Sequence, residues 1–369
     1  MSSTASSNVG HAEPSASQSL SGLPWLFSPW VDICTFLGSA LAAFALLAVG
    51  WYRGWLTSDS PEWSWVIGVL LIDVAHVYST GFRVYFDREE LRHRPALYGL
   101  TPLLAFLIGW ALHSESIELF WRTLAYLAVF HFIRQQYGWV ALYRARGSEH
   151  HRWGWWIDAT AIYLATIYPL VHWHGELPRQ FWWLRQGDFA AIPAMVSDLL
   201  MPIYWAAMAV YAGRSLYRGM VHGRWNPGKD MVVATTALCW YVGIITFNSD
   251  YAFLVTNVII HGVPYMVLVY RFRYVGQRAP QQRVRVPYWL RFLGVVWLLA
   301  YIEELLWDTT IWHERAWLFG GGVDVAAAET WIVPLLAVPQ LTHYVLDGFI
   351  WRRRSNQSVS QTFGSQPAG

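Results

Sequence analysis

Long apolar stretches separated by short polar segments dominate the chain. Ten of them are about 20 residues long, the length that a helix needs to cross a hydrocarbon core of about 30 Å. They lie at residues 30–51, 63–82, 95–113, 117–143, 154–173, 196–217, 230–248, 250–271, 287–306 and 330–351. The pattern predicts an all-α fold, a polytopic membrane helical bundle of about ten transmembrane helices.

Basic residues fall on alternate sides of these stretches. Nineteen Arg and Lys residues follow the second, fourth, sixth, eighth and tenth stretches, whereas the opposite connections hold four: Arg53, Arg179, Arg185 and Arg315. Cytoplasmic loops of membrane proteins retain basic residues and outer loops do not. The alternation therefore predicts that both termini are cytoplasmic.

Composition supports a membrane location. Of the 369 residues, 55% are hydrophobic and 14% are charged, against about 25% charged in an average soluble domain. The net charge of +2 gives no reason to expect nucleic acid as a partner. We expect an integral protein of a bacterial inner (plasma) membrane, with a disordered N-terminal tail at 1–24, one transmembrane domain at 25–352 and a disordered C-terminal tail at 353–369.

Four histidines lie inside the predicted helices: His76, His131, His261 and His343. All four belong to even-numbered stretches, which run in the same direction across the membrane. They precede the first basic residue of the following loop by seven, thirteen, ten and nine residues. At a rise of about 1.5 Å per residue, their depths agree to within roughly 10 Å. Ionisable side chains within a membrane are costly and are typical of functional sites, so we predict that the four rings share one metal site.

Each histidine has polar companions one helical turn away, where they share its face of the helix. The companions are Asp73 for His76, Arg134 and Gln135 for His131, Asn257 for His261 and Asp347 for His343. A metal-bound imidazole usually donates its second N–H group to a carboxylate, amide or carbonyl, and these companions suit that role. Either aspartate could instead be a ligand, and a hydrogen-bonded contact between helices is the simpler alternative for any single histidine.

Imidazole ligands suit zinc, copper, iron and nickel, so the residues alone do not name the metal. An apolar bundle is suited to an apolar substrate, whose C–H and C=C bonds need oxygen chemistry, and this favours non-haem iron. Two alternatives stay open. The histidines could be axial ligands of haem in a membrane electron carrier, or they could relay protons in a proton-coupled transporter.

The histidines lie in four short segments: DVAH at 73–76, HFIRQQYGW at 131–139, NVIIHGVPY at 257–265 and HYVLDGFIW at 343–351. Their arrangement, one histidine from each of several helices, resembles that of the Brp/Blh family of membrane carotene dioxygenases. The resemblance implies a single iron, held by histidines from separate spans, that cleaves a polyene with dioxygen.

We therefore expect an iron-dependent membrane oxygenase acting on a lipid, a carotenoid or another apolar small molecule. The expected metal ligands are His76, His131, His261 and His343, oriented by Asp73, Gln135, Asn257 and Asp347. The residues expected to act on the substrate are Arg134, which would hold a polar head group, and Tyr265 and Tyr344, which would shape the pocket or donate protons. Ordinary helix packing is the alternative for each tyrosine.

Overall fold

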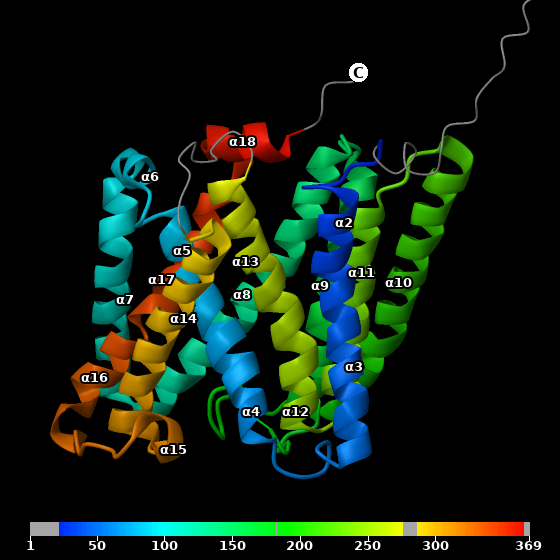
Figure 1. Cartoon of the computed structure of the whole chain (residues 1–369). Coiled ribbons are helices and arrows are strands. Elements are labelled where there is room, and N and C mark those ends of the chain that lie inside the picture. Colours follow the sequence, from blue (N-terminus) through cyan, green and yellow to red (C-terminus); the bar gives the residue numbers. More distant parts are fainter. Residues whose placement is uncertain (1–21, 182, 276–285, 365–369) are drawn as a thin grey trace, which may run out of the picture.

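The computed structural model describes residues 22–181, 183–275 and 286–364. Over these residues the protein is a bundle of long helices lying side by side (Figure 1), and none of the described residues forms a strand. Each of the ten predicted stretches coincides with one helix or with helical pieces that follow one another directly. The prediction of an all-α fold is confirmed.

Five of the ten stretches are single helices. They are α7 (Pro95–Glu115), α8 (Ile117–Arg146), α9 (Arg152–Gly175), α10 (Ala194–His222) and α14 (Tyr288–Trp307). The other five are built from consecutive pieces, some of them with the wider turns of a π-helix. These are α2 (Pro29–Asp32), η1 (Ile33–Leu37) and α3 (Gly38–Arg53); α4 (Glu62–Trp65), η2 (Val66–Val74) and α5 (Ala75–Arg83); α11 (Pro227–Trp240) and η3 (Tyr241–Thr246); α12 (Asp250–Phe253), η4 (Leu254–Val258) and α13 (Ile259–Tyr274); and α16 (Glu329–Leu336) and α17 (Val338–Ile350).

Short elements occupy the ends of the bundle. They are α6 (Arg88–His93), η6 (Asp308–Trp312), α15 (Ala316–Phe319), η7 (Ala326–Ala328), η8 (Arg353–Ser355) and α18 (Gln357–Phe363). Figure 1 places α6, α18 and the start of α2 at one end, and α15 and the starts of α4 and α12 at the other. The described chain thus begins and ends on the same side of the bundle.

Six helical segments among the described residues are long and apolar enough to cross a membrane. They are Pro29–Arg53, Glu62–Arg83, Pro95–Glu115, Ala194–His222, Pro227–Thr246 and Asp250–Tyr274. The remaining predicted stretches are helical but fall outside this group. Charged residues inside the helices, such as Arg134 in α8, Asp158 in α9 and Glu303 in α14, lower their mean hydropathy, and the tenth stretch is divided at Ala337. The ten-span topology therefore stays a prediction.

Local sequence explains where several helices begin and end. Ser116 precedes α8, and its hydroxyl accepts a hydrogen bond from the backbone N–H of Leu119 at 3.3 Å. Helices α3 and α10 end at Gly54 and Gly223, whose φ angles of 78° and 63° are left-handed. Glycine adopts this conformation without the steric cost that a Cβ atom would add.

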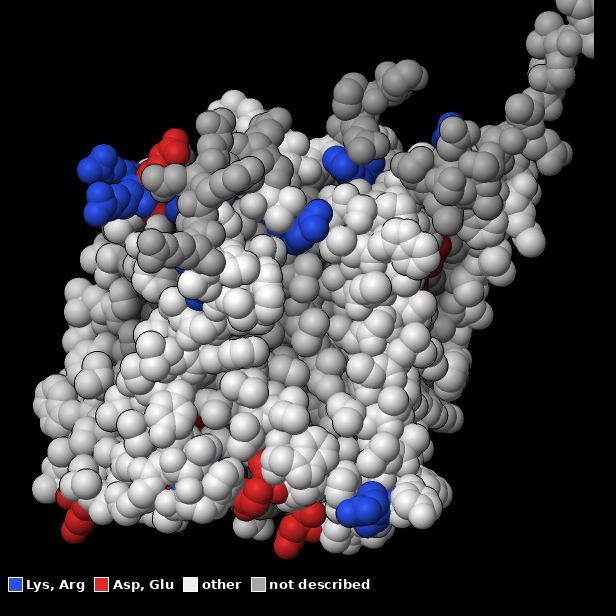
Figure 2. Space-filling view, viewed as in Figure 1, with Lys and Arg blue, Asp and Glu red and all other residues white. Residues whose placement is uncertain are grey.

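Charged side chains lie mainly at the two ends of the molecule. In the space-filling view, blue and red atoms gather at the upper and lower edges, and a broad band with few charges separates them (Figure 2). Large apolar side chains are exposed within this band, for example Leu104 and Ile108 of α7 and Ile203 of α10. A membrane interior accommodates such a surface, since exposed apolar side chains contact lipid there.

One end of the bundle encloses a network of ion pairs around two buried carboxylates, Glu149 and Asp158. Lys229 of α11 contacts both, with its Nζ 2.8 Å from Glu149 Oε2 and 3.1 Å from Asp158 Oδ2. Arg144, Arg214 and Arg218 complete the network. Burial alone would raise the pKa of the Glu149 carboxyl, but Lys229 and the other donors lower it to about 2. The network ties α8, α9, α10 and α11 together.

The segment after residue 352, for which we expected a disordered tail, contains α18. Val359 and Phe363 are four residues apart, so they share one face of this helix, and both are fully buried. They join the core cluster of Trp139, Tyr143 and Phe272. Asn356 caps the helix by accepting from the Val359 N–H at 3.1 Å. Of the N-terminal tail predicted at 1–24, residues 1–21 lie outside the described part of the chain.

Candidate metal centre

Four neighbouring helices each contribute one histidine to the interior of the bundle: His76 from α5, His131 from α8, His261 from α13 and His343 from α17. Helix α13 packs against α5, and α17 packs against both α5 and α8. None of the four side chains is more than 3% exposed. Helix packing therefore brings together the four histidines predicted from the sequence.

The four rings contact one another. The centroid of the His76 ring lies 4.6 Å from that of His261, 4.9 Å from that of His343 and 6.2 Å from that of His131. The His131 ring lies 4.5 Å from His343 and 5.1 Å from His261. A buried imidazole needs a partner for its polar nitrogens, because a buried polar group without one costs free energy. Here the Nε2 atoms have other imidazoles as partners.

The ring nitrogens meet in two pairs. His261 Nε2 lies 3.1 Å from His76 Nε2, and His343 Nε2 lies 3.1 Å from His131 Nε2. Metal–imidazole bonds of about 2.1 Å separate neighbouring ligand atoms by about 3.0 Å in an octahedral site and about 3.4 Å in a tetrahedral one. The observed spacing suits ligands that share one ion, and it is also the distance of an N–H···N hydrogen bond between two imidazoles.

Two groups of ligand atoms are compact enough to hold a metal ion. The first is His76, His131 and His343, and the second is Asp73, His76 and His261; within each group the ligand atoms lie within 4.8 Å of one another. His76 belongs to both groups. The structure therefore contains a buried three-histidine group that could hold a metal, with a fourth histidine and a carboxylate beside it.

Two of the histidines follow directly after wide helical turns. His76 lies two residues after the end of η2, and His261 lies three residues after the end of η4. A wide turn holds one more residue than a turn of regular α-helix, so it rotates the residues that follow. Such turns are frequent at functional sites. Gly262, next to His261, lets α13 approach η2 closely, since a Cβ atom there would lie 2.7 Å from Ile72 Cγ2.

The aspartates predicted to orient the histidines both lie beside them. Asp73 Oδ1 is 3.6 Å from His76 Nδ1, as its position one turn away predicts. Asp347 approaches His131 from the neighbouring helix, with its Oδ2 3.9 Å from the His131 Nδ1, and not His343 of its own helix. The partner predicted for Asp347 is therefore corrected.

His343 has a different partner, which the sequence did not reveal. Its Nδ1 lies 2.7 Å from the Oγ1 of Thr80 on α5, and the same hydroxyl lies 3.0 Å from the Tyr265 hydroxyl. Threonine is common in helices and carries no charge, so nothing in the chain distinguishes Thr80 from a packing residue. Its role follows only from the register of α5 against α17.

The two predicted amide companions do not bind the imidazoles. Gln135 Nε2 donates to the backbone carbonyl of His261 at 2.8 Å, so it links α8 to α13. Asn257 donates within its own helix, to Thr256 Oγ1 at 3.0 Å. The Nδ1 of His261 has no hydrogen-bond partner among the described residues. Helical spacing places these amides on the correct face, but nearer acceptors compete for their N–H groups.

Aromatic rings enclose the centre. The Tyr344 ring stacks on His131 with centroids 4.8 Å apart, and the Tyr265 ring meets His343 edge-on at 5.2 Å. Phe132, which sequence reasoning did not single out, stacks on His261 at 3.5 Å with an interplanar angle of 9°. These rings exclude water from the imidazoles and hold them in place.

Arg134 is not brought to the histidines. It lies on an exposed face of α8, where its guanidinium donates to the Tyr163 hydroxyl and lies 4.9 Å from the centre of the Tyr137 ring. Arg134 is three residues after His131, so its side chain points in a different direction from α8 and lies outside the interior of the bundle. The structure therefore gives no support to a substrate contact by Arg134 at this centre.

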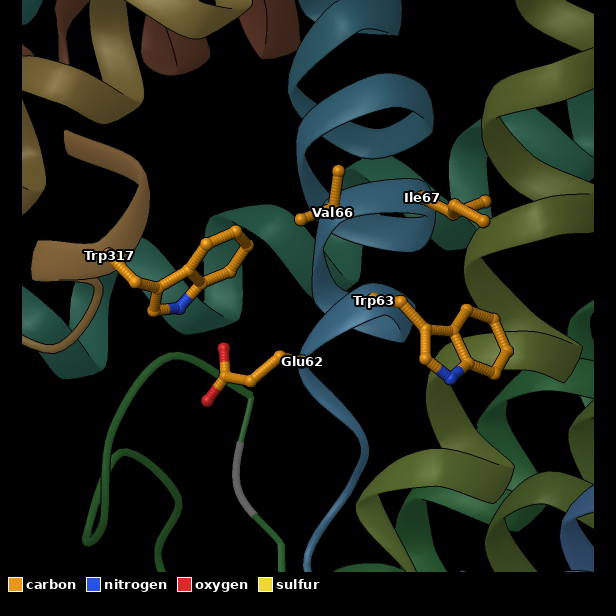
Figure 3. Close-up of a pocket in the computed structure, with 5 residues that line it drawn as sticks. All are labelled: Glu62, Trp63, Val66, Ile67 and Trp317. Atoms are coloured by element: carbon orange, nitrogen blue, oxygen red, sulfur yellow. The ribbon is translucent and has the colours of Figure 1, made fainter.

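A separate surface hollow of about 560 Å³ lies near the end of the bundle and is shown in Figure 3. Its lining residues are Glu62, Trp63, Val66, Ile67 and Trp317. Ile67, the nearest of them to His76 along the chain, precedes it by nine residues, which is about 13 Å of helix. This hollow is therefore not part of the histidine centre.

Comparison of the chain with protein-family models, curated proteins and solved structures finds no match. The resemblance of the four histidine segments to the Brp/Blh family is thus not accompanied by a family match. The structure itself shows a buried histidine group that could hold a metal, inside a helical protein with six candidate membrane spans.

Proposed function

We propose that this protein is a membrane-embedded, non-haem iron oxygenase acting on an apolar substrate. The proposal includes ten transmembrane helices, with both termini on the cytoplasmic side of a bacterial plasma membrane. The single observation that carries it is the pairing of Nε2 atoms at 3.1 Å among four buried histidines from four helices.

The charge around the centre supports a divalent cation. The four imidazoles are neutral ligands, and Asp73 and Asp347 lie beside His76 and His131. Two carboxylates balance the charge of one divalent ion, which lowers the cost of burying that ion in an apolar bundle. Each aspartate also lies on the Nδ1 side of an imidazole, where it favours the tautomer that leaves Nε2 free to bind metal.

Iron, when bound, would supply activation of dioxygen for oxidation of a C–H or C=C bond. The chain's own residues have other tasks. Thr80 fixes the ring of His343 through Nδ1, and the buried Tyr265 hydroxyl beside Thr80 could supply a proton. Phe132 and Tyr344 cover the imidazoles and exclude water, which protects a reactive centre from side reactions.

The spacing of the rings disfavours the haem alternative. Two axial imidazoles on one haem iron lie on opposite sides of the macrocycle, with nitrogen atoms about 4 Å apart. Here the paired nitrogens are 3.1 Å apart, and the rings of His76, His131 and His343 pack within 6.2 Å of one another. This spacing supports a non-haem ion over a haem held between the paired rings.

Elemental analysis of the detergent-purified protein tests the proposal. We expect about one iron per chain in the wild type and a loss of at least tenfold in His261→Ala, because one ligand is removed. His113→Ala is the matched control, since His113 is also buried, at 5% exposure, but lies on α7 away from the four rings. Iron-free protein from iron-replete cells, or equal loss in both variants, would contradict the proposal.

A further inference from the structure

An apolar groove of about 260 Å³ lies between α7, α8 and α17. Two threonines line it, and Thr101 already donates its hydroxyl hydrogen to the Leu97 carbonyl at 2.6 Å. The apolar lining includes Leu104 and Ile108 of α7, Leu124 and Leu127 of α8, and Leu341 and Val345 of α17. The groove thus offers a ligand almost nothing but hydrocarbon contact.

The groove opens toward the outside of the bundle at the level of the apolar band. Leu104, Ile108, Leu127 and Val345 are all between 41% and 58% exposed. In a membrane-spanning bundle the medium at this level is lipid, so the chains of the bilayer have direct access. The residues flanking the groove on α7, Leu103 and Leu107, are also apolar and exposed.

The inner side of the groove is formed by α8 and α17, the helices that carry His131 and His343. Leu127 and Leu124 precede His131 by four and seven residues, so they lie on the same face of α8. Tyr344 packs in one apolar cluster with Leu124 and Leu341, which line the groove, and its ring stacks on His131. Tyr344 therefore contacts the His131 ring and belongs to the same apolar cluster as residues that line the groove.

We propose that this groove holds the linear hydrocarbon chain of a bilayer lipid, the substrate of the metal centre, with the chain directed at Tyr344 and His131. The inference rests on the proposed oxygenase function. A volume of about 260 Å³ is smaller than the range of about 300–1,000 Å³ typical of pockets for drug-sized ligands. A groove of this size suits a segment of one extended chain better than a fused ring system or a partner helix. Tyr344 is the positioning residue that limits how closely the chain approaches.

Photo-crosslinking tests this assignment without requiring catalysis. A palmitate analogue with a diazirine near its terminal carbon is added to the purified, iron-loaded protein in lipid nanodiscs, and the labelled peptides are mapped by mass spectrometry. We expect labelling concentrated in α7, α8 and α17. Equal labelling of other lipid-facing helices, such as α10, would overturn the proposal.

Variants sharpen the test. Leu127→Trp fills the groove one turn from His131, and we expect labelling of the three helices to fall about tenfold, equivalent to about 1.4 kcal/mol of binding free energy. Leu119→Trp is the matched control, because Leu119 is on the same helix and is 42% exposed, against 41% for Leu127, but does not line the groove. Unchanged labelling in Leu127→Trp would overturn the proposal.

Two further measurements keep the inference separate from the proposed function. Leu104→Trp fills the groove from α7 and replaces Leu127→Trp if that variant does not fold. The labelling is repeated on iron-free protein, since the groove exists without the metal. Confined labelling in a protein that never binds iron would refute the oxygenase and retain the hydrocarbon site. Iron binding together with labelling spread over other lipid-facing helices would retain the oxygenase and refute the hydrocarbon site.

Discussion

Glu149 provides a stability test of the ion-pair network at one end of the bundle. Lys229 and Arg218 hold its carboxylate inside the protein, and its pKa falls from an ordinary value of 4.5 to about 2. One pKa unit corresponds to about 1.4 kcal/mol, so the shift represents about 3 kcal/mol of folded-state stabilisation. We expect Glu149→Gln to lose this contribution.

The pH dependence has a definite sign. A carboxyl whose pKa is lowered on folding stabilises the folded state fully above its unfolded pKa of about 4.5, and the contribution is lost as the pH falls toward 2. About 2 of the 3 kcal/mol are lost between pH 7 and pH 3. The wild type should therefore exceed Glu149→Gln in stability at pH 7, and the difference should shrink on acidification.

The assay is unfolding in detergent, followed by tryptophan fluorescence from pH 7 to pH 3, with wild type and Glu149→Gln measured in parallel. Comparison of the two proteins cancels the titration of other groups. Glu89→Gln is the control, since Glu89 is an exposed glutamate on α6 at the same end of the bundle. A difference between wild type and Glu149→Gln that stays constant over this pH range would refute the reasoning.

Two further predictions concern the packing around the histidines. Thr80→Val removes the hydroxyl beside His343 Nδ1, and we expect metal affinity, measured by competition with a chelator, to fall about 10–100-fold while Thr80→Ser retains it. Gly243→Ala would place a Cβ atom 1.9 Å from Thr256 Oγ1, so thermal unfolding should show a loss of about 1–3 kcal/mol, whereas Gly294→Ala, with no atom within 4 Å, should lose none.

The helices could be predicted closely because apolar length is a local property. The predicted stretch at 117–143 became α8 (Ile117–Arg146), and 330–351 became α16 and α17. The break at Ala337 and the wide turns of η2 and η4 were not predicted, since they depend on how neighbouring helices pack. The helix α18 was missed because two buried residues, Val359 and Phe363, carry its only apolar signal.

The sequence predicted which histidines form the candidate site, but it predicted their neighbouring polar residues less well. The number of residues between each histidine and the following basic loop predicted that His76 and His131 lie at similar depths in the membrane. This count needs no knowledge of how the helices pack. The partner of each ring depends on the rotation of one helix against another. That is why Asp347 reaches His131 instead of His343, and why Thr80 was not recognised.

X-ray absorption at the iron edge tests the central claim most directly, because it counts the imidazoles bound to the metal. For the wild type we expect a nitrogen shell at about 2.1 Å with the outer scattering of about four imidazole rings. Removing a single ligand, as in His343→Ala reconstituted with excess ferrous iron to offset its weaker binding, should reduce the imidazole scattering per bound iron by about a quarter. A spectrum with no imidazole scattering, or one unchanged by the loss of His343, would contradict the proposal that these four histidines hold one ion.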